Sequence, residues 1–84
     1  MDIERLGIRL RSLRKSKGMT LEELASSLGI SASYLSEVER GRKAPSLNTL
    51  CNLAELLGLS RNFLLDILGT PKGATTLGDV VRLR

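Results

Sequence analysis

The 84-residue sequence has no histidine and a single cysteine, Cys51. Without histidine the chain lacks the commonest general base and a frequent metal ligand, and it has no acidic pair at metal spacing, so we expect no enzyme, metal or cofactor. One cysteine cannot form an internal disulfide, which fits a reducing compartment. There is no run of about 20 apolar residues and no signal-peptide segment, so we expect a cytoplasmic protein without a membrane partner.

Aromatic residues are also scarce, since Tyr34 and Phe63 are the only two. The hydrophobic share is nevertheless 42%, which is enough for a modest core built mainly from leucine. A chain of this length is the size of one compact domain, so we expect no separate catalytic or sensor domain.

Positive charge exceeds negative charge, with 13 basic and 9 acidic side chains and a net charge of +4. The basic residues gather in two places: residues 1–18, and the cluster Arg40, Arg42 and Lys43. Such clusters suit a polyanionic partner, and the alternative interpretation is an ordinary solvated charged face.

Apolar residues recur at intervals of three and four, which predicts helices and no sheet. The first helix is expected over about residues 2–16. The second follows a capping box formed by Thr20 and Glu23 and ends at Gly29, and the third begins with Ser31 as its N-cap and ends at Gly41. These elements indicate the first half of an all-α protein.

Two further helices are expected, capped by Ser46 and Ser60. We assign the apolar face of the fourth helix to Leu47, Leu50, Cys51, Ala54 and Leu57. We assign that of the fifth to Phe63, Leu64, Ile67 and Leu68. On this assignment Cys51 is a core thiol, with a redox-sensitive group as the alternative.

The predicted fold is a compact five-helix bundle in residues 1–69, followed by a linker and C-terminal tail at 70–84. The spacing of Leu77, Gly78, Val81 and Arg82 repeats that of Leu6, Gly7, Leu10 and Arg11. This is either a chance match in a frayed tail or the start of a further module.

Residues 20–40 have the pattern of a helix-turn-helix. Such a motif needs a small residue where its two helices approach, a glycine in the turn and aliphatic residues at fixed offsets in the second helix. Ala25 supplies the first and Gly29 the second. The aliphatic anchors are Ile30, Leu35 and Val38.

Over residues 3–68 the chain resembles the phage-repressor type of helix-turn-helix, also called the xenobiotic-response-element or Cro-like family. The resemblance is carried by residues 10–14, 17–20, 23–25, 28–31, 34–36, 38–41 and 45–47, and by Leu50, Leu53, Ala54, Leu57 and Gly58. It implies a lambda-repressor-like fold that binds double-stranded DNA, with the helix after Ser31 as the recognition helix in the major groove.

The resemblance also implies a role for individual residues. Base contacts are expected from Ala32, Ser33, Ser36 and Glu37. DNA backbone contacts are expected from Thr20, Ser31, Tyr34, Arg40, Arg42, Lys43 and Ser46. Arg14 and Glu39 match a pair that in the family joins the first helix to the recognition helix, so we expect a partly buried ion pair there.

One position departs from the family, because Leu21 stands where many members have a glutamine that braces the DNA backbone and the recognition helix. The expected base-reading side chains also lack the arginine–guanine and glutamine–adenine pairs that discriminate best, so we expect a large contribution from DNA shape.

The function that follows is a transcriptional regulator, expected to be a repressor that binds a palindromic or near-palindromic operator as a homodimer. The fifth helix and the C-terminal tail are the expected dimer surface, because Leu56 and Leu65 are apolar residues beyond those needed to pack one face of each helix against the core. The alternative is that both belong to an unusually wide core face. The second hypothesis is a protein-interaction module, such as an antitoxin, that chiefly binds a partner protein. Leu21 and Glu37 favour this alternative.

Overall fold

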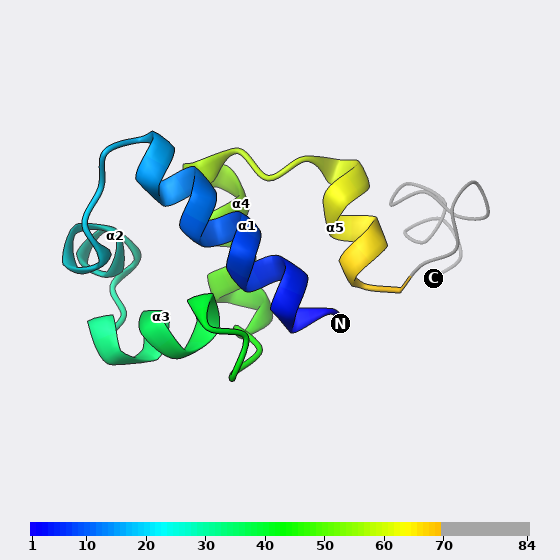
Figure 1. The fold of residues 1–84 in the computed structure, drawn as a ribbon, viewed down its shortest axis with the longest axis horizontal. Coiled ribbons are helices and arrows are strands. Elements are labelled where there is room, and N and C mark those ends of the chain that lie inside the picture. The colour runs from blue at the N-terminus through cyan, green and yellow to red at the C-terminus, as the bar shows by residue number, and fades with distance from the viewer. Residues whose placement is uncertain (70–84) are drawn as a thin grey trace.

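The computed structural model describes residues 1–69, which form five α-helices and no β-strand within that range (Figure 1). The helices are α1 (Ile3–Ser16), α2 (Leu21–Leu28), α3 (Ala32–Glu39), α4 (Leu47–Leu57) and α5 (Arg61–Ile67). The prediction of an all-α, five-helix fold is therefore confirmed. None of these helices is long and apolar enough to cross a membrane. The expected linker and tail at 70–84 fall outside the described residues.

The helices begin where short polar side chains satisfy their free N–H groups. Thr20 accepts from the N–H of Glu23 while the Glu23 carboxylate accepts from the N–H of Thr20, at 3.1 and 2.8 Å. This is the predicted capping box. The other N-caps are Asp2, Ser31, Ser46 and Ser60. Each supplies an acceptor to the residue three positions later, which sets the start of its helix.

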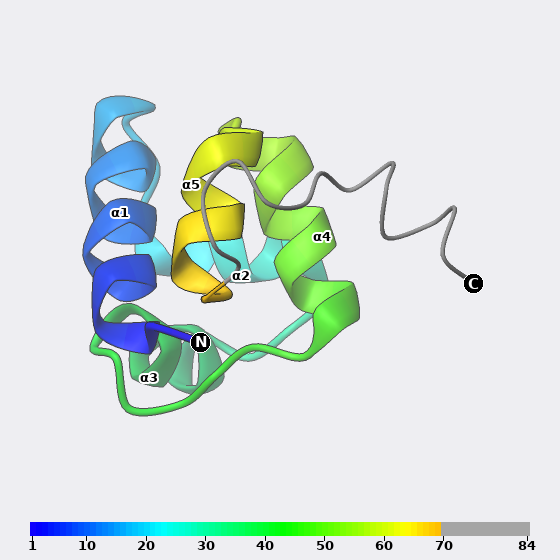
Figure 2. The same cartoon turned by 90° about the vertical axis from the view of Figure 1, so that its right-hand side faces the viewer.

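The helix α1 contacts α3, α4 and α5. In Figure 1 it lies between α2 on one side and α5 on the other, and Figure 2 shows α5 in front of the space between α1 and α4. The residues of α1 that face the core, Leu6 and Leu10, are fully buried. They pack in one cluster with Leu24, Leu35 and Leu53 of the other helices, so the core is mainly aliphatic, as expected, with Phe63 as its one aromatic residue among those described.

The two ends of the described chain are joined. The N–H of Asp2 donates to the carbonyl of Ile67 at 2.7 Å. The guanidinium groups of Arg5 and Arg9 lie 5.7 and 4.8 Å from the centre of the Phe63 ring, close enough for cation–π attraction. These contacts hold the short helix α5 against α1.

The predicted apolar face of α4 is wrong at two positions. Leu47 is 76% exposed and Cys51 is also exposed, so the expected core thiol is not part of the core. The buried stripe of α4 is instead Thr49, Leu50, Leu53 and Leu57. Thr49 tolerates burial because its hydroxyl lies 2.9 Å from that of Ser46 and its N–H donates to the same atom. This turns Leu47 and Cys51, which are four residues apart, outward together. Leu68 likewise lies beyond the end of α5 and is 45% exposed.

A glycine inside α1 allows a close approach between α1 and α3. Gly7 is buried against the end of α3, and a Cβ at this position would lie 2.8 Å from the carbonyl oxygen of Val38 and closer still to that of Glu39. Both neighbours are backbone atoms, which cannot move without displacing α3. Only glycine therefore lets α1 pack at this distance.

We predict that Gly7→Ala destabilises the protein by about 2 kcal/mol, although alanine in an exposed helix would stabilise it by roughly 1 kcal/mol. Urea unfolding followed by circular dichroism measures the change. Ser12→Ala, on the exposed side of the same helix, is the control and should stay within about 0.5 kcal/mol of the parent. A Gly7→Ala protein as stable as the parent would show that α1 and α3 are not in this contact.

Candidate nucleic-acid interface

The turn between α2 and α3 brings the two helices of the motif together. Gly29 has φ +69°, a left-handed conformation that most side chains disfavour, and the N–H of Ile30 donates to the carbonyl of Ala25 at 3.1 Å. Ala25 is 2% exposed, and Leu35 and Val38 of α3 are buried in the same cluster. Because one stripe of α3 is buried against α1 and α2, the opposite stripe faces outward.

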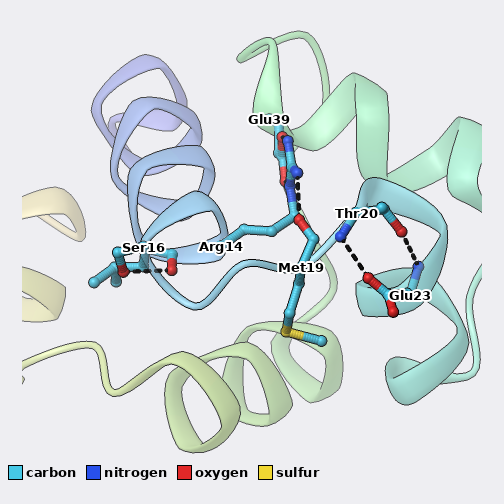
Figure 3. Close-up of polar contacts among 7 residues, drawn as sticks. Arg14, Ser16, Met19, Thr20, Glu23 and Glu39 are labelled. Atoms are coloured by element: carbon cyan, nitrogen blue, oxygen red, sulfur yellow. Dashed lines mark hydrogen bonds and ion pairs between the residues drawn. The ribbon is translucent and has the colours of Figure 1, made fainter.

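Arg14 and Glu39 form a bidentate ion pair between α1 and the end of α3 (Figure 3). Nε and Nη2 of Arg14 donate to the two carboxylate oxygens at 2.8 and 3.0 Å. Nη1 donates to the carbonyl of Met19 at 2.9 Å, just before the first residue of the capping box. The side chains are 11% and 5% exposed. One guanidinium therefore positions the end of α3 and the entry to α2 with respect to α1.

The surroundings of Arg14 keep its guanidinium group positively charged. The hydrogen bond to Glu39 raises the pKa of Arg14 above its ordinary value, partly opposed by burial and assisted by the charges of Glu39 and Glu22. A raised pKa on a cation adds stability that is fully present below the unfolded-state pKa and is lost only above the folded-state pKa. Since both lie beyond the ordinary range of pH, deprotonation of Arg14 does not open the pair there.

The four residues expected to contact bases differ in their exposure. Ser33 is exposed, whereas Ser36 and Glu37 are partly buried. Ala32 is also partly buried and packs against the core. The carbonyl of Glu37 accepts from the N–H groups of Arg42 and Lys43 at 2.9 and 3.4 Å. The loop that follows α3 and carries Arg42 and Lys43, called the basic loop below, is thus fixed to the last turn of α3.

The expected backbone contacts fall into two groups. Arg40, Arg42 and Lys43 are exposed, and within residues 1–69 none of them has an ion-pair partner. The capping residues, in contrast, already make hydrogen bonds within the chain. The Thr20 N–H is held by Glu23, and Ser31 caps the N–H of Tyr34.

Tyr34 and Ser46 contact each other. The Ser46 N–H donates to Tyr34 Oη at 3.2 Å, which links α3 to the start of α4. The hydroxyl proton of Tyr34 has no acceptor among the described residues, so it can still be donated outward.

A hollow that the sequence did not indicate lies beside α3. It has a volume of about 230 Å³ and is lined by Arg11, Arg14, Leu21, Ser36, Glu39 and Arg40. Arg11 was not among the expected contact residues. The signal that could have found it is its position three residues before Arg14, on the same side of α1.

The comparisons with known proteins agree with this arrangement. A family model described as "Helix-turn-helix domain" matches residues 5–64. The chain belongs to the helix-turn-helix domain family. The resemblance to the phage-repressor, Cro-like type is consistent with this membership.

Members of the family with similar sequences include two curated proteins and a solved structure. The HTH-type transcriptional regulator DdrOP3 of Deinococcus deserti is 47% identical over 58 residues, which are 69% of this chain and 45% of that protein. The uncharacterized HTH-type transcriptional regulator y4dJ of Sinorhizobium fredii is 42% identical over 79 residues, 93% of this chain and 97% of that protein. The crystal structure of the clp gene regulator ClgR from C. glutamicum superposes with a TM-score of 0.69 at 44% identity, covering 83% of this chain and 91% of that one.

We predict that Glu39→Ala destabilises the fold by about 3 kcal/mol, because it leaves the Arg14 guanidinium buried without its counter-charge. Arg14→Met combined with Glu39→Leu should recover most of the loss, since it removes both charges and keeps apolar volume. Urea unfolding of the three proteins measures both effects. A loss below about 1 kcal/mol for Glu39→Ala would contradict the pair's role in joining α1 to α3.

Proposed function

We propose that the chain is a DNA-binding transcription regulator that acts as a repressor, with α3 as the recognition helix in the major groove. The observation that carries this proposal is the combination of an outward α3 stripe with three exposed cations at its end that have no ion-pair partner within residues 1–69. They are Arg40, Arg42 and Lys43. A buried ion pair fixes this helix against α1. The relatives named as transcriptional regulators support the same function.

In this proposal some side chains contact the bases and others contact the DNA backbone. We assign contacts with base edges to Ser33 and Glu37, and Ala32 can offer only an apolar contact. Ser36, which the sequence led us to expect at a base, lines the hollow beside Arg11 and Arg40. The basic loop and Tyr34 meet the DNA backbone, and those contacts set register without reading sequence. Because the base-reading set is small, sequence-dependent DNA shape supplies the remaining selectivity. The proposed activity is therefore binding rather than catalysis.

The proposed assembly is a homodimer on a palindromic or near-palindromic operator. Two recognition helices must then lie about 34 Å apart, one turn of B-DNA. Leu56 and Leu68 are 40% and 45% exposed, and Leu65 is partly buried, so α5 and the end of α4 offer apolar surface to a second copy. The C-terminal tail belongs to the proposed dimer surface but is outside the described residues.

For the DNA interface, we predict that Arg42→Ala weakens binding to every duplex alike and lowers the salt slope by about 0.9, the value for one lost phosphate contact. Glu37→Ala should instead change the preferred base pair at one position, by roughly 1–3 kcal/mol. Fluorescence anisotropy against duplexes selected by the parent protein from a random pool measures both. Arg61→Ala, an exposed arginine on α5, is the control for loss of charge once sedimentation velocity has shown that it assembles like the parent.

The outcomes separate the candidate functions. Binding that is undetectable or insensitive to salt would refute the DNA proposal and favour the protein-interaction module. If Arg42→Ala and Glu37→Ala both act uniformly on all duplexes, α3 is not placed in the major groove as proposed.

For the dimer, we predict that Leu56→Glu shifts the parent's dimer toward monomer, because it places a charge in an apolar contact. Sedimentation velocity measures the change. Leu47→Glu is the matched control, since Leu47 is more exposed but lies at the other end of α4. A monomeric parent protein, or equal dissociation by both variants, would contradict the proposed surface.

A further inference from the structure

The hollow beside α3 brings together residues from three helices. Arg11 and Arg14 come from α1, Leu21 is the first residue of α2, and Ser36 belongs to α3. Arg40 is the C-cap of α3, one turn after Ser36, so their side chains share one side of the helix. The hollow thus adjoins the proposed recognition helix. It also includes a part of α1 that has no DNA contact in the proposed function.

The charge that lines the hollow is positive. The two carboxylate oxygens of Glu39 are both occupied by Arg14, which neutralises that pair. Arg11 and Arg40 are exposed and have no ion-pair partner within residues 1–69. Glu22, whose charge acts on Arg14, is exposed and does not line the hollow. Two uncompensated guanidinium groups therefore remain on the walls.

The other lining groups suit an anion of moderate size. The Ser36 hydroxyl makes no hydrogen bond within the described residues, so it is free to donate. Leu21 brings neither an acceptor nor a charge. The volume of about 230 Å³ is several times the share of one water molecule, about 30 Å³, so a tetrahedral phosphate group fits with water beside it.

We propose that Arg11 and Arg40 hold a single backbone phosphate of duplex DNA in this hollow, with Ser36 as a third donor. The inference rests on the proposed function and deepens it. It adds α1 to the DNA-binding surface and assigns Ser36 to the backbone instead of a base. It also explains how a chain with Leu21 at the start of α2 can hold the DNA backbone there, because arginines on either side supply the donors. Arginine suits this role because its fork of N–H groups matches phosphate oxygens.

The first test is the salt dependence of DNA binding. The probe is a fluorescein-labelled duplex selected by the parent protein from a random pool, titrated between about 50 and 200 mM salt. Arg11→Gln and Arg40→Gln should each weaken binding about tenfold, and each should lower the salt slope by about 0.9. Arg61→Gln removes the same charge from α5 and is the control for charge; because α5 belongs to the proposed dimer surface, sedimentation velocity checks that this variant assembles like the parent. Since Arg11 and Arg40 have no ion-pair partner among the described residues, thermal unfolding of these variants should match the parent.

The second test asks whether the two arginines share one phosphate. Each phosphate of the duplex is replaced in turn by an uncharged methylphosphonate. We expect one phosphate whose replacement lowers the affinity of the parent protein but not that of Arg11→Gln or of Arg40→Gln. Loss of sensitivity at two different positions would refute the shared phosphate.

The remaining outcomes are also decisive. If the parent binds the duplex with a steep salt slope but Arg11→Gln behaves like Arg61→Gln, this inference fails while the proposed function stands. If the parent binds no duplex at any of these salt concentrations, both fail.

Discussion

The packing of α3 against α1 is the constraint on which the candidate interface depends. Two contacts at the same place maintain it. At Gly7 the absence of a side chain lets α1 approach the backbone of α3, and the guanidinium of Arg14 then reaches Glu39 and the carbonyl of Met19. The first contact is steric and the second electrostatic, but both fix the last turn of α3. The outward stripe of α3, the basic loop and the hollow all take their position from that turn.

A buried ion pair fixes the relative position of two helices more strictly than apolar contacts do. Removing charges from water costs free energy that their attraction only partly recovers, so such a pair adds less stability than well-packed apolar groups would. Its geometry, however, is more exacting. A bidentate guanidinium–carboxylate contact has one favourable orientation, whereas leucine contacts tolerate small shifts of a helix. If α3 enters a DNA groove as proposed, a fixed position offsets this cost.

Much of the fold was predictable from sequence because its signals are local. N-caps such as Thr20 and Ser31, and turn glycines such as Gly29, act within a few residues, so their effect can be deduced without knowing the tertiary structure. The pair of Arg14 and Glu39 is separated by 25 positions, and only the family resemblance indicated it. The buried face of α4 was predicted wrongly because cysteine is usually buried and threonine usually exposed. In the structure Thr49 is buried, since its hydroxyl has a hydrogen-bond partner in the hydroxyl of Ser46. The hollow was missed because it depends on the separation of three helices, which periodicity does not encode.

The backbone hydrogen bond from Asp2 to Ile67 has a consequence for how the protein opens. At seven residues, α5 is too short to persist as an isolated helix, and α1 and α5 are the first and last helices of the described chain. Because the bond and the arginine–Phe63 contacts join the two, fraying of either end removes support from the other. Local unfolding should therefore involve the start of α1 and all of α5 as one cooperative unit, with matching rates of amide hydrogen exchange, while the α2–α3 pair stays closed.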